Sequence, residues 1–340
     1  MSEAAVPAKP RSSARRALTR PELSSLLGAV AVFVLFFVVA PPFRQPAALS
    51  TVLYSSSVIG IVAVPVALLM IGGEFDLSAG VAVTASSLTA SITAFQLTAN
   101  VWVGVGAALV LSLAVGFLNG YLVTRTGLPS FLITLSTFLM LQGLDLAVTK
   151  LLTGTVATDS ISDMDGFASA KAVFASEVPL GGVAVDITVF WWILFVALGT
   201  WILLRTRAGN WIYAVGGRAE AARAVGVPVS RTKIALFLGV GFGAWFAGMH
   251  QVFAFDSVQS GIGAGNELLF IAAAVIGGCL LTGGSGSAVG AAIGALIYGM
   301  TTQGIVYAGW NPDWLKFFVG ATLLAATLLT RWVRPHTRGR

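Results

Sequence analysis

The chain has 340 residues, of which 56% are hydrophobic and only 10% are charged, and its formal net charge is +6. Soluble globular proteins carry about 25% charged residues, so this chain has too few to cover itself with a solvated surface. The composition therefore excludes a water-soluble enzyme, a disordered chain and a coiled coil, and it predicts a membrane protein with several spans.

About ten apolar runs follow one another along the chain, each close to the roughly 20 residues that a helix needs to cross the hydrocarbon core. Because the runs are continuously apolar and do not alternate, they favour an all-α polytopic fold over a β-barrel. Short polar breaks such as residues 98–100 leave eight or nine spans as alternatives, if one run is re-entrant. The runs cover residues 23–40, 52–72, 78–97, 101–123, 130–149, 187–204, 234–255, 267–282, 288–308 and 315–332.

A basic segment precedes the first run, and a signal peptide can share that pattern. The first run ends at Ala40, Pro41 and Pro42 without a small-x-small cleavage site. We therefore expect an uncleaved first helix behind a cytoplasmic tail of residues 1–22. The basic residues of this tail are Lys9, Arg11, Arg15, Arg16 and Arg20.

The distribution of Lys and Arg sets the orientation, because these residues resist translocation. With both termini in the cytoplasm, including a C-terminal tail of residues 333–340, sixteen of the twenty Lys and Arg lie on the cytoplasmic side. The basic charge is thus an orientation signal and a lipid-facing collar, and no nucleic-acid partner is expected. Beyond the N-terminal tail, the cytoplasmic basic residues are Arg125, Arg205, Arg207, Arg218, Arg223, Arg231, Lys233, Arg331, Arg334, Arg338 and Arg340.

Two loops between the runs exceed twenty residues. The outer loop, about 150–186, is too short for a domain and is expected to form a cap or a docking surface. The inner loop, 205–233, contains a segment at 218–225 that is rich in Ala, Glu and Arg, and Gly226 and Pro228 would end a helix there. The sequence predicts a short helix along the cytoplasmic face.

Glycines occur at i and i+4 within three runs, at Gly116 and Gly120, Gly239 and Gly243, and Gly290 and Gly294. Such pairs place two small residues on one helical face and let helix backbones approach closely. They predict a compact bundle and no particular function.

A weak internal echo links residues 72–77 with residues 265–268, since both have small residues and then an acid near a Leu at the start of a new run. One junction is expected on the cytoplasmic side and the other outside. Spans 2–5 and 7–10 would then be inverted-topology repeats, an architecture that many transporters use.

The same two junctions carry the candidate residues for a translocation path or gate, because a carboxylate in a bilayer is costly to bury. These candidates are Gly73, Glu74 and Asp76 at the first junction, and Asn266 and Glu267 at the second. Two structural interpretations compete with this one: Glu74 faces cytoplasmic water, and Asn266 is the N-cap of a helix in which Glu267 suits the dipole.

Asp76 also has a structural alternative, in which it caps the third span by accepting hydrogen bonds from the N–H groups of Ser78 and Ala79. Asp145, near the outer end of a run, could reach water. We expect His250 to be a hydrogen-bonded structural residue and Cys279 to be a small packing residue.

The sequence shows no metal-ligand spacing and no nucleophile with a paired base, so neither a metal site nor catalytic residues are expected. No Gly-Lys-Ser/Thr sequence occurs, so the chain lacks a phosphate-binding P-loop and would not hydrolyse ATP itself. An intramembrane enzyme is disfavoured because no polar cluster is evident in adjacent spans.

Three ordered motifs resemble one family. Residues 71–80, IGGEFDLSAG, resemble the GG-x-D-L-S-x-G signature of the simple-sugar permease subunits of ABC importers, the ribose and xylose type, which are related to the branched-chain amino acid permeases. Residues 213–226, YAVGGRAEAARAVG, look like the coupling loop of that family and keep its E-A-A-x-x-x-G core. Residues 266–278 and 283–287 resemble the later signatures, and Glu74 with Phe75 departs from the family, which usually has one Ile there.

The resemblance implies a type II ABC importer-like permease of the bacterial plasma membrane, which forms a dimer and carries a pentose, a hexose or a related polyol. A periplasmic or extracellular binding protein would deliver the sugar, and separate cytoplasmic ATPase subunits would bind ATP and Mg, so that no cofactor belongs to this chain. The short inner helix would dock on the ATPase through Arg218, Glu220, Ala221, Ala222, Arg223 and Gly226.

One alternative stays open at this point: a secondary transporter that is driven by protons and uses Glu74, Asp76 or Glu267 as the relay. Such a carrier would work alone, whereas an ABC permease needs an ATPase and a binding protein.

Overall fold

In the computed structural model, which describes residues 21–98 and 100–333, each of the ten apolar runs forms or contains a helix. Of the predicted tails, residues 1–20 and 334–340, with their basic residues, lie outside the described part. The helices of the runs are α2 (Pro21–Val39), α3 (Pro46–Ile71), α4 (Ala79–Ile92, continued by the π-helical η2, Thr93–Thr98), α5 (Val101–Thr126), α6 (Ser130–Thr153), α8 (Ile187–Arg205), α10 (Val229–Phe255), α11 (Asn266–Ile276), α12 (Ala288–Tyr307) and α13 (Leu315–Val333).

Seven of these helices are long and apolar enough to cross a membrane, by length and composition, within the described residues. The run predicted at 267–282 differs most, because α11 has only 11 residues. At about 1.5 Å per residue it is far shorter than the roughly 30 Å of a hydrocarbon core. Gly277 and Gly278 end it, the latter with φ +93°, and turns lead from there to α12. The first part of this run therefore forms a short helix, and the rest forms turns, so that the run is not a full span.

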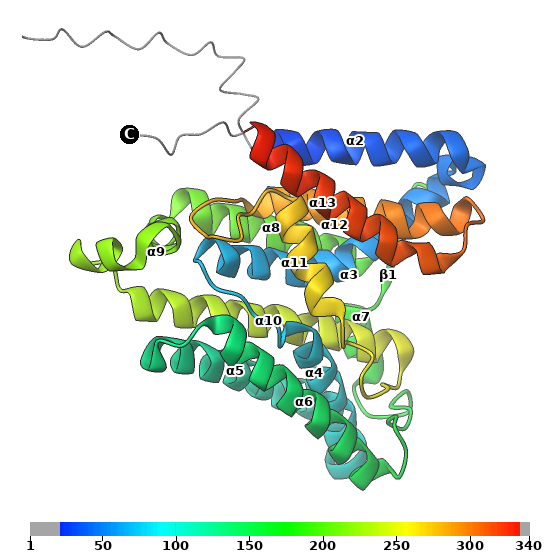
Figure 1. The fold of residues 1–340 in the computed structure, drawn as a ribbon. Helices are drawn as coiled ribbons and strands as arrows, with labels where there is room; N and C mark the ends of the chain where they lie inside the picture. Colours follow the sequence, from blue (N-terminus) through cyan, green and yellow to red (C-terminus); the bar gives the residue numbers. More distant parts are fainter. Residues whose placement is uncertain (1–20, 99, 334–340) are drawn as a thin grey trace, which may run out of the picture.

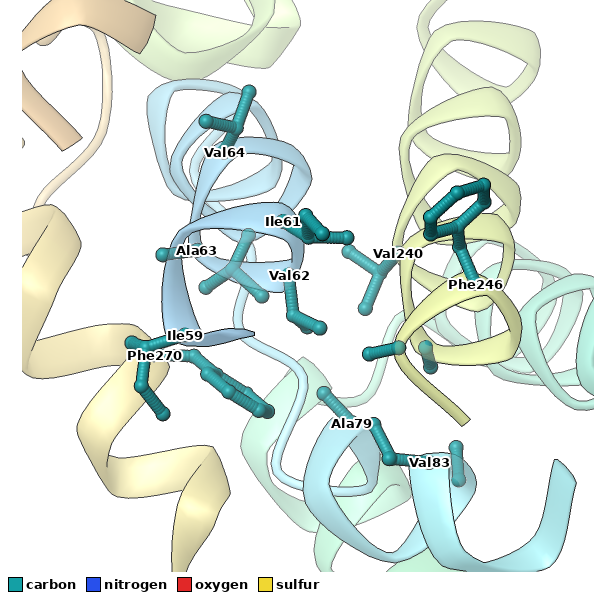
Figure 2. Packing of buried hydrophobic residues seen from close by; sticks show 14 of the residues in the cluster. Ile59, Ile61, Val62, Ala63, Val64, Ala79, Val83, Val240, Phe246 and Phe270 are labelled. Carbon is teal, nitrogen blue, oxygen red and sulfur yellow. The ribbon is translucent and has the colours of Figure 1, made fainter. Parts of the chain in front are cut away.

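Helix α3 lies at the centre of the bundle, where it contacts α8, α10, α11 and α12. Every residue from Ile59 to Ile71 is buried, as expected of a helix that is apolar all round. Figure 2 shows its side chains packed against α4, α10 and α11, among them Val83, Val240 and Phe270. In Figure 1, α5 and α6 lie on one side of this core, and α2 and α13 lie on the opposite side. The outer helices expose large apolar side chains, which suits contact with lipid.

Two of the three predicted glycine pairs form close helix contacts. A Cβ on Gly116 would lie 2.6 Å from the carbonyl oxygen of Phe237 in α10, and Gly120 is similarly close to α10. Gly290 and Gly294 pack in the same way against α11. In the third pair only Gly243 meets a neighbour, the ring of Pro65 in α3, whereas Gly239 borders open space.

The two ends of the bundle carry different additions. Helix α9 (Arg207–Ala224) projects from one end, and α7 (Phe167–Phe174) lies at the other with a hairpin of β1 (Glu177–Leu180) and β2 (Val183–Asp186) (Figure 1). We call these the α9 end and the α7 end. The hairpin turns through Gly181 and Gly182, which both have positive φ, as a tight two-residue turn requires.

At the α7 end, the predicted outer loop packs on α10. The Phe174 ring is buried and stacks on Phe253, with ring centroids 5.8 Å apart. The Phe174 carbonyl oxygen lies 2.9 Å from Nδ1 of His250, whose Nε2 lies 3.1 Å from the Tyr54 hydroxyl. The structural role expected for His250 is thus confirmed.

Two other single-residue expectations have different outcomes. Asp145 does not reach water: it is 8% exposed in α6, and its Oδ2 has no hydrogen-bond partner among the described residues. Its position on the face of α6 that turns toward the bundle causes this burial. Cys279 is buried, as expected of a packing residue, but it lies in the turns after α11 and not in a span.

Candidate functional site

The predicted coupling helix is the outer part of α9. Arg218 has extended backbone angles (φ −159°, ψ 99°), so α9 consists of two helices that meet at a kink. The second one covers residues 219–224 and ends at Gly226, which has φ +85° and donates its N–H to the Arg223 carbonyl. A left-handed residue after a helix is the usual place for glycine. The prediction of a short helix stopped by Gly226 is confirmed, with its start at 219 and not at 218.

One face of this coupling segment, residues 218–226, is anchored and the other is free. The Ala222 side chain is buried in a small cluster with Val215 and Val229. The other candidates, namely Arg218, Glu220, Ala221, Arg223 and Gly226, are exposed, and Val225 is 80% exposed at the tip. Neither ion pair within the described residues uses the charges of this segment. The segment therefore presents unpaired charges and an apolar tip beyond the bundle.

Just before the kink, α9 touches the turn that ends α3. A Cβ on Gly216 would overlap the carbonyl oxygen of Ile71, which accepts a hydrogen bond of 2.8 Å from the Gly284 N–H. A Cβ on Gly283 would lie 2.7 Å from the Gly73 Cα. Three stretches of chain thus meet backbone to backbone at a glycine junction made of Gly73, Gly216, Gly283 and Gly284.

Glu74 lies beside this junction and does not face water as one interpretation expected. It is 7% exposed and forms an ion pair with Lys233 in α10, whose side chain is 20% exposed. Burial is tolerated because the opposite charge compensates the lost hydration. Lys233 lies a few residues beyond the coupling segment, so this pair ties the start of α10 to the α3–α4 connection.

Asp76 is held by a chain of polar side chains. Its Oδ1 accepts hydrogen bonds from the Ser78 N–H (2.8 Å) and the Ser78 hydroxyl (2.6 Å). The Asn119 amide donates to Ser78 Oγ at 2.9 Å, and the Thr137 hydroxyl donates to Asn119 Oδ1 at 2.7 Å. Burial raises the pKa of the Asp76 carboxyl, and these hydrogen bonds oppose that rise. The predicted bond from the Ser78 N–H is formed and the one from Ala79 is not, and because Ser78 is itself the N-cap of α4, Asp76 is not the cap of this helix.

The same connection receives two hydroxyls that the sequence did not reveal as site residues. Ser130 Oγ accepts a hydrogen bond from the Phe75 N–H at 3.0 Å, and Thr134 Oγ1 accepts one from the Leu77 N–H at 3.1 Å. Both lie in the first turns of α6. They satisfy backbone groups of the connection that no helix uses.

The second predicted junction lies at the start of α11, beside the first turn of α4. Helix α11 begins at Asn266, and its N-cap is Gly265 with φ +97°, so Asn266 is not the cap. The backbone at this position is left-handed, which favours glycine because glycine has no Cβ. Both carboxylate oxygens of Glu267 lie 3.0 Å from the Gly265 nitrogen, as suits an acid in a first turn. A Cβ on Gly80 would overlap Glu267, so α4 and α11 begin side by side.

The structure therefore divides the predicted path residues into two groups. Gly73, Glu74 and Asp76 lie in the α3–α4 connection, whereas Asn266 and Glu267 lie at the start of α11. The predicted echo between these junctions is not matched by their turns. Instead the end of α3 at Gly72 and Gly73 repeats at the end of α11, at Gly277 and Gly278, with the same pattern of hydrogen bonds. The inverted repeat itself stays a prediction.

The α3–α4 connection, α9 and α11 all lie within a region that matches one protein family. The family model described as "Branched-chain amino acid transport system / permease component" matches residues 48–327. The chain belongs to this permease family. This permease is 33% identical to the ribose import permease protein RbsC of Escherichia coli (strain K12) over 323 residues. The aligned region covers 93% of this chain and 97% of RbsC.

Two further relatives agree. The probable ABC transporter permease protein y4mJ of Sinorhizobium fredii (strain NBRC 101917 / NGR234) is 32% identical over 91% of this permease and 90% of its own length. The fructose import permease protein FrcC of Rhizobium meliloti is 29% identical over 84% of this permease and 78% of its own length. The family resemblance stated from the motifs is confirmed: the chain is a multi-pass membrane protein of this permease family, and relatives that cover most of its length are named as sugar import permeases.

Proposed function

We propose that this permease is the membrane subunit of an ABC importer that carries a simple sugar, a pentose, a hexose or a related polyol, across the bacterial plasma membrane. Its energy would come from a separate ATPase that binds ATP and Mg, and a sugar-binding protein outside would deliver the solute to a permease dimer. The observation that carries the proposal is the coupling segment, an anchored short helix with unpaired charges at one end of an apolar bundle. Relatives whose names state ribose and fructose import support the substrate class.

The contacts of the coupling segment suggest how ATPase movement would reach the membrane. The segment continues through Gly226 into α10, and α10 is tied to the α3–α4 connection by the pair of Lys233 and Glu74. On its other side the kink follows Gly216, which touches Ile71 directly. Two short links thus join the segment to helices α3 and α4. In this proposal the α9 end and both termini are cytoplasmic.

The proton-driven alternative finds less support in the geometry. A relay needs acids within hydrogen-bond reach of one another or of a bridging water. Here Glu74 pairs with Lys233, Asp76 with Ser78, and Glu267 with Gly265, and no hydrogen bond among the described residues joins two of these acids.

The proposed coupling is tested by reconstituting the permease in vesicles with its ATPase and binding protein. Glu220→Lys and Gly226→Asp are expected to reduce ATP-dependent uptake at least tenfold while the protein stays in the membrane. Glu220→Lys reverses a charge of the docking face, and Gly226→Asp forces a side chain into left-handed backbone. Uptake of labelled sugar and the amount of membrane protein are measured together.

Gln96→Leu is the control, because this exposed side chain at the α7 end is remote from the coupling segment. Normal ATP-dependent uptake by both coupling variants would contradict the proposed role. Accumulation of solute by the permease alone, without an ATPase, would reject the whole proposal.

A further inference from the structure

A pocket of about 300 Å³ opens between α3, α10, α11 and α12, and one of its lining residues, His250, contacts Phe174 of α7. Its volume is at the lower end of the range for small-molecule sites, about 300–1,000 Å³. The side chains relevant here are Tyr54, Ser55, His250, Gln251, Asn266 and Tyr298. By contrast, a larger cavity beside Trp192, Trp201 and Leu204 is lined almost wholly by apolar groups.

The hydrogen bonds around the pocket fix the roles of two hydroxyls. Because Nδ1 of His250 faces the Phe174 carbonyl at 2.9 Å, it carries the proton, and Nε2 must accept from the Tyr54 hydroxyl. The Tyr54 oxygen therefore keeps lone pairs for a ligand. Ser55 Oγ accepts a bond of 2.7 Å from Gln303 Nε2, so its own proton is available to donate.

Two amides add donors and acceptors. Gln251 Oε1 lies 3.4 Å from the Ser87 hydroxyl, and no hydrogen bond among the described residues uses the Gln251 NH₂ group. The side-chain amide of Asn266, at the start of α11, likewise has no partner in the described part of the chain. Half-buried amides without partners in an apolar surrounding favour a ligand that satisfies them.

The charge of the pocket selects among ligand classes. No Asp, Glu, Lys or Arg lines it, and His250 is held in a neutral tautomer by its two partners. A zwitterionic amino acid would lose its hydration here without gaining an ion pair. A polyol loses little free energy on leaving water, because each of its hydroxyls can both donate and accept hydrogen bonds in the pocket. The rings of Tyr54, Tyr298 and Phe270 offer apolar faces for its C–H groups.

We propose that this pocket binds an uncharged polyhydroxy solute, with Tyr54, Ser55, Gln251 and Asn266 contacting its hydroxyls. The inference rests on the proposed function and names the residues that recognise its substrate. It also favours sugars over amino acids, although the family description names the latter. The pocket is lined by Val83 of α4 and by Asn266 and Phe270 of α11, so a bound solute would contact the two helices that begin side by side.

The test uses the full complex in vesicles and four probes: D-ribose, D-xylose, D-fructose and L-leucine. Wild-type uptake first identifies the transported probe, and KM and maximal rate are then measured for Gln251→Leu, Asn266→Leu and Tyr54→Phe. Loss of one hydrogen bond to a ligand is expected to raise KM about fivefold to tenfold. Gln96→Leu is the matched control and should leave KM unchanged.

Uptake of a sugar with wild-type KM in all three variants would reject the pocket and leave the proposed function intact. Uptake of L-leucine instead of any sugar would reject both. If the Leu variants fail to fold, Asn266→Cys in a Cys279→Ala background gives a second readout. The transported sugar should then slow labelling of the introduced thiol by a thiol reagent severalfold, but it should not slow labelling in Gln96→Cys. Labelling that the sugar leaves unprotected in both variants would reject the pocket.

Discussion

At the scale of single residues, the ion pair of Glu74 and Lys233 shows how an unusual residue is accommodated. Glu74 is buried between Gly73 and Asp76, and it lies 159 residues from its partner along the chain. A carboxylate buried without a partner would be strongly unfavourable, so the pair is a condition of the local fold. Its place between α10 and the α3–α4 connection makes it a structural link as well.

We expect Glu74→Gln and Lys233→Met, each alone, to destabilise the protein by about 3 kcal/mol, because either change leaves one charge buried and unpaired. The double variant should recover much of that loss, since both charges are then absent. Thermal unfolding of the purified permease in detergent measures the four members of this cycle. Additive losses in the double variant would show that the two side chains do not interact.

The same double variant separates the two transport hypotheses. Sugar uptake that is energised by ATP should be reduced but not abolished in Glu74→Gln with Lys233→Met, because the link of Gly216 to Ile71 remains and neither group needs to exchange a proton. A proton-driven carrier with Glu74 in its relay would lose uptake completely. Vesicle uptake with and without an imposed pH gradient distinguishes these outcomes.

At the scale of elements, the glycine junction explains why α9 can approach the end of α3. Main-chain atoms meet there directly, so a single methyl group has no space and no flexible side chain can yield. The short α11 belongs to the same arrangement, because the turns after it provide Gly283 and Gly284. Helices interrupted in this way occur in transporters where backbone lines a path or a gate.

Gly216→Ala is expected to reduce uptake at least tenfold, because its Cβ would overlap the Ile71 carbonyl and push α9 away from the α3–α4 connection. Gly217→Ala is the matched control, since nothing lies within 4 Å of its Cβ position. An alanine there should be neutral or slightly stabilising in a helix. Equal uptake by the two variants would show that the junction does not transmit movement.

At the scale of the whole molecule, the proposed orientation, with both termini and the coupling segment in the cytoplasm, rests on the positive-inside rule. The coupling segment and the hairpin of β1 and β2 lie at opposite ends of the bundle, so the proposal places them on opposite sides of the membrane. Cys279 is the single cysteine in the sequence, and it is buried. Single cysteines therefore report the sidedness directly.

In a Cys279→Ala background, Ala221→Cys should react with a membrane-impermeant thiol reagent only from the cytoplasmic side. Leu180→Cys, at a hairpin position that is 51% exposed, should react only from outside. The readout is labelling of whole cells against labelling of inverted vesicles. Labelling of both cysteines from one side would overturn the proposed orientation.

Sequence alone determined the class of molecule, the ten helical regions, the short helix with its stop at Gly226, and the family. These features depend on composition, on hydrophobic runs and on glycines that end helices. Each of these signals arises from residues that are close together in the chain. Only the tertiary structure decided that α11 is too short to span, that Glu74 pairs with Lys233, and that Gly216 meets Ile71. It also gathered Tyr54, Gln251 and Asn266 around one pocket. These outcomes depend on residues far apart in the chain, whose contacts exist only after the helices have packed.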